Sequence, residues 1–273
     1  MSLKKYSLLI IVFCLTASFY ITVHNAFYTP SVNAIDLSPI LTKSTLTDED
    51  YALIYTQTGI AKPLTQELQT MPHFTEKMLK FQANYLKKKK VRWLYIFPVT
   101  FEERLIDQNG LDTIGFELGP YHNGYILFTK AAHSAFWHHG HCGLVVDEAH
   151  GKTLEAIHMG SGCALQNISK WQYYPTFKMM RLKNTSLEQL NRISHTAYAN
   201  LQSATYHLLA QKDSDSSLIP TKTQCALLIW QAFYQFGYDL DAQDGLFVTP
   251  KSLASSPLLE VLQIYGFNPE KVW

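Results

Sequence analysis

The spacing of apolar residues separates a helical part of the chain from a part rich in strands. Between residues 35 and 90, apolar residues recur every three or four positions, in the runs 46–56, 63–71 and 74–90. This spacing gathers apolar side chains on one helix face and predicts a helical N-terminal region over residues 35–90. No catalytic pattern lies between the apolar positions, so we interpret the region as a packing or spacer segment.

From residue 91 the pattern changes to short runs rich in aromatic and β-branched residues, which Gly, Pro, Asn or Asp separate. Such runs predict β-strands, here over residues 92–97, 124–129, 142–147, 153–158 and 176–182. Residues 145–149 and 153–157 flank the turn His150-Gly151-Lys152. They predict an antiparallel hairpin.

Helical spacing returns after the strands. We expect a helix from Ser186 to about Leu209 and another from Thr223 to Gly237, with a glycine as the stop. Thr249-Pro250 and Ser256-Pro257 have the form of short helix starts. Strands followed by helices predict an α+β domain over residues 91–273, with an antiparallel sheet packed on helices.

The first residues predict a targeting or membrane segment. Lys4 and Lys5 precede an uncharged stretch over residues 6–23, so residues 1–34 fit a signal peptide or a membrane anchor. The stretch is longer than most signal-peptide cores and just reaches the length of a spanning helix. Val32-Asn33-Ala34 resembles a cleavage site. Removal of the segment and its retention as an anchor both stay open. Either fate places the rest of the chain outside the cytoplasm.

Composition and charge bear on whether the chain folds and on which partners it can have. With 47% hydrophobic residues among 273, the chain should fold, and a net charge of +1 gives no reason to expect nucleic acid as a partner. Beyond the N-terminal segment the cysteines are Cys142, Cys163 and Cys225. An odd number in an exported protein leaves at least one without an internal partner. A Cys142–Cys163 bridge stays open.

Cys225 lies at the start of a predicted helix, shortly after Pro220. Free N–H groups at a helix N-terminus lower the pKa of a thiol and favour the nucleophilic thiolate. The same cysteine also belongs to an apolar helical stripe with Leu228 and Ala232, which is typical of a core residue. A nearby base would decide between these interpretations.

His141 is the candidate base, because it opens a predicted strand and an imidazole can take the thiol proton and return it to the leaving group. Glu155 is the one charged residue in an apolar run on the neighbouring strand. Its carboxylate would orient the imidazole, although a solvent-facing glutamate is the alternative. Strand alternation turns Cys142 away from His141 and predicts a packing role.

Several residue types near His141 also bind zinc. His138, His139 and Cys142 lie within four positions of one another, and with His141 they carry zinc-binding atoms. Their spacing matches no specific zinc pattern, so we predict no metal and no cofactor. We interpret His138 and His139 as substrate contacts.

Two groups of segments resemble one family. Residues 124–129, 139–146 and 153–156, followed by 224–233, 237–241 and 248–257, are similar to the permuted NlpC/P60 papain-like proteins. That group includes the YiiX/YebB-like and YycO-like distant relatives of cell-wall-associated hydrolases. Their histidine strand precedes their cysteine helix, as it does here, and the resemblance covers approximately residues 120–265.

The resemblance implies a circularly permuted papain-like fold with Cys225 as nucleophile, His141 as base and Glu155 as third member. The family often has Tyr-Cys-Ser around the nucleophile, whereas this chain has Gln224-Cys225-Ala226. We therefore interpret Gln224 as a donor to an oxyanion.

Together these observations predict an extracytoplasmic cysteine hydrolase or acyltransferase, membrane-anchored or secreted, in a bacterial cell envelope. Its expected substrate is a peptidoglycan peptide amide, or a lipid or acyl ester. The alternatives are a non-catalytic binding or scaffold module of the envelope, and a metal-dependent hydrolase that uses the histidine cluster.

Overall fold

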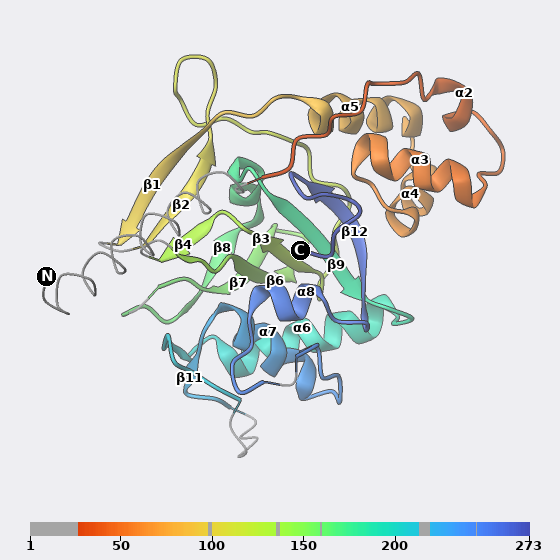
Figure 1. The fold of residues 1–273 in the computed structure, drawn as a ribbon. Helices are drawn as coiled ribbons and strands as arrows, with labels where there is room; N and C mark the ends of the chain where they lie inside the picture. The colour runs from red at the N-terminus through yellow and green to blue at the C-terminus, as the bar shows by residue number, and fades with distance from the viewer. Residues whose placement is uncertain (1–26, 98–99, 135–136, 159, 213–218, 244) are drawn as a thin grey trace, which may run out of the picture.

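The structure, a computed structural model, describes residues 27–97, 100–134, 137–158, 160–212, 219–243 and 245–273 (Figure 1). It is a mixed α+β arrangement with antiparallel sheets and helices, which confirms the predicted fold class at that level. In the described part of the chain, no helix is long and apolar enough to cross a membrane. The predicted membrane segment over residues 6–23 lies outside the described residues.

The predicted helical N-terminal region is confirmed. It consists of α2 (Ser38–Leu41), α3 (Asp48–Thr58), α4 (Lys62–Gln69) and α5 (Phe74–Leu86). Thr47 begins α3 with a capping box, because its side chain accepts from the Asp50 N–H and the Asp50 carboxylate accepts from the Thr47 N–H. The last helix ends at Leu86, before the lysine run that the prediction included, where the backbone of Lys87 is extended.

A six-stranded sheet forms the centre of the described structure, in the order β12-β9-β3-β6-β7-β8, and every pair is antiparallel (Figure 1). Its strands are β3 (Ile126–Thr129), β6 (His141–Asp147), β7 (Lys152–Ala156), β8 (Cys163–Asn167), β9 (Phe177–Leu182) and β12 (Leu259–Tyr265). The predicted hairpin is confirmed as β6 and β7, with Leu144 opposite Leu154. The 3₁₀ helix η1 (Ile168–Tyr173) follows β8.

A second sheet, in the order β1-β2-β4-β5, lies beside the first. Its strands are β1 (Val91–Phe97), β2 (Thr100–Leu105), β4 (Ala132–Ser134) and β5 (Trp137–His138). The sequence predicted β1 only. The remaining strands are short or carry consecutive charges, as in Glu102-Glu103-Arg104, and such runs lack the alternation that identifies a strand.

Two predictions on the C-terminal third are wrong at the level of individual elements. The first long helix, α6 (Leu187–Leu201), ends before Leu209, because β10 (Thr205–Tyr206) pairs in parallel with β11 (Lys222–Thr223). Ser256-Pro257 starts no helix. It leads into β12, which pairs with β9 along its length and buries Leu262 and Ile264. Tertiary pairing thus overrides the local helix-start signal.

The helices that carry the candidate chemistry pack on the central sheet. Both α6 and α7 (Cys225–Tyr234) contact β6, and α7 also contacts β7. The short helix α8 (Pro250–Ala254) follows and packs against α7. Figure 1 shows α6 and α7 on one side of the central strands and α3 to α5 near β12. The first turn of α7 therefore lies against the start of the hairpin.

Candidate active site

Cys225 is the first residue of α7. The side chain of Gln224 caps this helix, because its Oε1 accepts from the Ala226 N–H at 2.8 Å. Gln224 Nε2 donates to Val248 O at 2.6 Å, and this second bond holds the capping side chain in place. Cys225 thus lies two residues closer to the positive end of the helix than a start at Thr223 would place it.

His141 begins β6 and is buried, with 5% of its surface exposed. Because α7 packs on this strand, His141 and Cys225 line the same small cavity, with a volume of about 20 Å³. The other residues that line it are Ile96, Thr100, Glu102, Ala132, His139, Ile157 and Tyr206. A space of this size holds about one water molecule.

Glu155 lies on β7 and is fully buried, so the solvent-facing alternative is excluded for this residue. The ring of His141 donates through Nε2 to Glu155 Oε2 at 2.6 Å. This bond occupies one ring nitrogen, and Nδ1 is the one that remains for the thiol. The carboxylate therefore orients the imidazole toward Cys225.

The carboxylate of Glu155 receives three further hydrogen bonds. Lys170 Nζ donates to Oε2 at 2.6 Å, Thr153 Oγ1 donates to Oε1 at 2.5 Å, and Trp171 Nε1 donates to Oε1 at 3.1 Å. Sequence reasoning missed these donors. Lys170 and Trp171 come from η1, and only the folded chain brings that turn back to β7.

Gly143 makes room for this arrangement. A Cβ at this position would lie 2.9 Å from Cγ of Glu155 and 3.0 Å from Cζ2 of Trp171. Real Cβ contacts are longer than the first of these distances, so any side chain on Gly143 would push Glu155 away from His141.

The charges of the site follow from its contacts. Burial alone would raise the pKa of Glu155, but Lys170 and His141 outweigh it and lower this pKa to about 2. Burial likewise opposes a charge on His141, yet its interactions with Cys225 and Glu155 raise the pKa of the imidazole to about 9. Near neutral pH the pair is an imidazolium beside a carboxylate.

The pKa of Cys225 lies well below the ordinary value of a thiol. An interaction with Cys142 contributes most to the decrease, burial opposes it, and His141 lowers the pKa further. The decrease favours the thiolate, which is the form that attacks a carbonyl.

Cys142 is fully buried, as expected for a packing residue, but its thiol also interacts with Cys225. Burial raises the pKa of Cys142 well above the usual value, so it stays neutral and acts as a donor to the thiolate. Cys142, Cys163 and Cys225 are all free in the structure. The Cys142–Cys163 bridge that the sequence left open does not form there.

His139 lines the cavity, as a substrate contact should. Its Nδ1 lies 2.6 Å from the Gly140 carbonyl oxygen and must donate, so Nε2 accepts from Ser134 Oγ at 2.9 Å. Burial lowers the pKa of His139, and the ring is neutral. Both ring nitrogens are occupied, so His139 presents only carbon atoms to a substrate.

The contacts of His138 and Gln224 bear on their predicted roles. His138 is not among the residues that line the cavity and lies instead beside Glu103 and His133. The amide nitrogen of Gln224 donates to Val248 and its oxygen caps α7, so both ends of the side chain are already bonded. Its role as an oxyanion donor stays a prediction.

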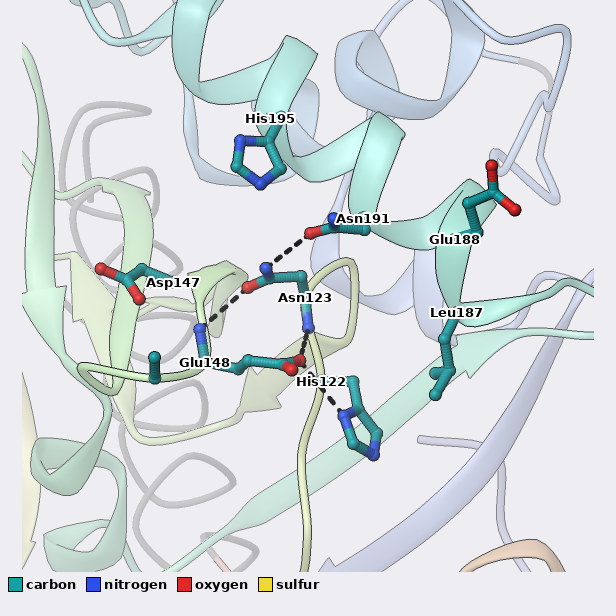
Figure 2. Close-up of a pocket in the computed structure, with 9 residues that line it drawn as sticks. His122, Asn123, Asp147, Glu148, Leu187, Glu188, Asn191 and His195 are labelled. Atoms are coloured by element: carbon teal, nitrogen blue, oxygen red, sulfur yellow. Dashed lines mark hydrogen bonds and ion pairs between the residues drawn. The ribbon is translucent and has the colours of Figure 1, made fainter.

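A larger hollow lies elsewhere, with a volume of about 440 Å³ over α6 and the turn between β6 and β7. Figure 2 shows bonds that join Asn123 to Glu148 and to Asn191, and His122 to Glu148. The nine residues that line it, all described, include no cysteine. We therefore place the candidate chemistry in the smaller cavity.

No protein-family model matches this chain, and no curated protein and no solved structure matches it.

Proposed function

We propose that this protein is a cysteine hydrolase or acyltransferase in which Cys225 is the nucleophile, His141 the acid and base, and Glu155 the residue that positions the imidazole. The observation that carries the proposal is the buried series of contacts from the first residue of α7 through His141 to a carboxylate that accepts four hydrogen bonds. Such a series activates nucleophiles in unrelated acyl-transfer enzymes.

The mechanism begins with attack of Cys225 Sγ on an acyl carbonyl carbon. A C–S bond forms, and the carbonyl π electrons move to oxygen. The backbone N–H of Cys225 and the positive end of α7 stabilise that oxyanion, while the Ala226 N–H is already bound to Gln224. His141 then gives its proton to the leaving group, whose bond to the acyl carbon breaks.

Release of the acyl group reverses these roles. Neutral His141 takes a proton from water or from an acceptor hydroxyl or amine, and that nucleophile attacks the thioester carbonyl. The C–S bond breaks and the thiolate returns. Glu155 holds the ring through both steps, because its fixed acceptor oxygen keeps Nδ1 directed at the reacting atoms.

The finer fold is part of the proposal. The histidine strand β6 precedes the cysteine helix α7, and the two pack together as the permuted papain-like order requires. A peptidoglycan peptide amide, or a lipid or acyl ester, and a location outside the cytoplasm with membrane attachment through residues 6–23, belong to the same proposal. They rest on the sequence resemblance and the N-terminal pattern.

One observation favours the alternative of a non-catalytic binding or scaffold module. Cys225 is 7% exposed, and the cavity beside it is too small for an acyl substrate. Catalysis therefore requires the wall of the cavity to open, whereas a scaffold does not.

Site-resolved alkylation tests the proposal. The full-length protein is labelled with iodoacetamide from about pH 5 to about pH 9, and each cysteine is quantified by mass spectrometry. Because the pKa of Cys225 is lowered, its labelling rate should already be high near pH 6 and rise little above it. His141→Ala should slow it at least about tenfold at that pH.

Cys163 is the internal control, because burial raises the pKa of its thiol to about 12 and it should label slowly throughout. Circular dichroism checks that the His141 variant is folded. A Cys225 profile that rises around the ordinary thiol pKa of about 8.5, with the same rate in both proteins, contradicts the catalytic proposal. Labelling of Cys225 only after unfolding supports the scaffold.

A further inference from the structure

A second cluster of chemically active side chains lies in the sheet β1-β2-β4-β5. Glu103 on β2, His133 on β4 and His138 on β5 each offer an oxygen or nitrogen atom, and these atoms lie within 4.8 Å of one another. His133 and His138 are opposite each other in the β4–β5 ladder. Their ring centroids are 3.5 Å apart.

Three side-chain atoms of this cluster have no hydrogen-bond partner among the described residues. They are Oε2 of Glu103 and the Nε2 atoms of His133 and His138. The side chains of Glu103 and His133 are only 3% and 2% exposed. Buried polar atoms are paired in nearly all native structures, so three unpaired atoms in one cluster require an explanation.

Hydrogen bonds within the cluster do not account for the unpaired atoms. His133 Nε2 lies 3.3 Å from Glu103 Oε1, and His138 Nε2 lies 3.8 Å from the same oxygen. The second distance is too long for a hydrogen bond. A proton shared between His133 and Glu103 would still leave the other carboxylate oxygen and His138 unpaired. A single cation would satisfy all three groups at once.

We propose that Glu103, His133 and His138 bind a divalent transition-metal ion, with Zn²⁺ as the first candidate. Two imidazoles and one carboxylate are a ligand set that such ions accept, with water in the remaining position. Zn–ligand bonds of about 2.1 Å require ligand atoms about 3.4 Å apart. Side-chain rotation can close the present separations, and His138 has the most freedom, with 20% of its side chain exposed.

The local electrostatics suit a cation. Burial lowers the pKa of His133 to about 3 and that of His138 to about 4, so both rings are neutral, which is the form that ligates metal. Burial raises the pKa of Glu103 to about 7. A bound cation would supply the positive charge that the buried carboxylate otherwise lacks.

The position of the cluster assigns the ion a structural role. Thr100, Glu102 and Ala132 line the cavity of Cys225, and strand alternation directs their neighbours Glu103 and His133 to the opposite face. An ion there would join β2, β4 and β5 behind the cavity wall. On that face His133 stacks on Phe101, with ring centroids 4.5 Å apart.

This site differs from the histidine group considered in the sequence. His139 and His141 belong to the Cys225 cavity, and His138 alone is shared with the metal site. The sequence signal was weak, because the three ligands come from three strands whose pairing the pattern did not predict. Binding of an ion at this site does not depend on the chemistry of Cys225.

The test uses the full-length protein, purified in mild detergent and stripped with a chelator. Titration with Zn²⁺ by calorimetry should show one equivalent bound and a raised Tm, and Co²⁺ should give the visible bands of a protein-bound ion. Glu103→Gln and His138→Ala should each weaken Zn²⁺ binding more than the roughly 10–100-fold that loss of a second-shell partner costs.

Two control variants separate this site from others. Cys225→Ala removes the thiol as a competing ligand, and His150→Ala removes an exposed histidine on the β6–β7 turn. Both should bind one Zn²⁺ as the wild type does. Absence of saturable Zn²⁺ binding overturns the proposal. So does full binding in both ligand variants, or binding lost in Cys225→Ala, which assigns the ion to the thiol.

Discussion

At the scale of single residues, Glu155 determines the chemistry of the candidate site. It carries a charge in a fully buried position, which is stable only because four donors surround it. Lys170 supplies the compensating charge, and 19% of its side chain reaches the surface. The negative charge of Glu155 is therefore fixed, and together with Cys225 it keeps His141 in the protonated form.

Replacing that charge should lower the pKa of His141. Glu155→Gln keeps the shape and an acceptor oxygen but removes the charge, so this pKa should fall from about 9 by about one unit or more. Site-resolved hydrogen–deuterium exchange at the imidazole carbon measures it. Asp147→Asn is the control, because Asp147 pairs with His150 on an exposed turn. An unchanged exchange profile of His141 in Glu155→Gln contradicts the assigned role.

The same residues show how much of the site the sequence could predict. Glu155 was visible as a lone charge in an apolar run, and Cys225 as a thiol at a helix start. Glu103 and His133 could not be predicted as site residues, because neither is unusual in its own segment. The pairing of β2 with β4 brings them together. A residue that is unusual in its own segment can be found from the sequence. Ordinary residues that only the fold brings together cannot.

At the scale of elements, the first turn of α7 is held from two sides. Gln224 bonds to the helix through Ala226 and to the loop before α8 through Val248. The prediction placed this helix well because its apolar residues have one clear period. It failed at the end of α6 and at β12, where pairing with distant strands decides the structure.

Removal of the α7 cap should destabilise the protein. Gln224→Ala loses a cap worth about 1 kcal/mol and leaves the Val248 carbonyl unpaired, for a total of about 2–3 kcal/mol. Urea unfolding measures the loss. Ser186→Ala is the matched control, because Ser186 caps α6 through the Gln189 N–H but is exposed, and it should cost only about 1 kcal/mol. Equal losses would show that the Val248 bond contributes nothing.

At the scale of the whole molecule, the N-terminal helices are joined to the central sheet. Ile60 bridges Gln263 on β12, the Ala61 N–H donates to Leu262 O at 2.9 Å, and the Ile264 N–H donates to Gly59 O at 2.8 Å. Since β12 is the outer strand of its sheet, this segment covers an edge that would otherwise be unpaired. Apolar residues of both parts belong to one buried cluster.

Gly59 is the residue on which this junction depends. Its φ is +74°, and a Cβ there would lie 2.2 Å from Ile264 O. Gly59→Ala therefore combines a backbone strain of about 1–2 kcal/mol with a clash that breaks the bridge. Gly110→Ala is the matched control, because its φ is +80° and a Cβ there would have no neighbour within 4 Å among the described residues.

The loss of unfolding free energy should be larger for Gly59→Ala than for Gly110→Ala by about 1–3 kcal/mol, as measured in urea. Backbone hydrogen exchange should also rise at Ala61 and Ile264 in the first variant alone, because their N–H groups form the junction. Equal free-energy losses with unchanged exchange would mean that the helices are held by their apolar contacts and not by this segment. In that case the helices and the sheet would stay together without the backbone bonds at β12.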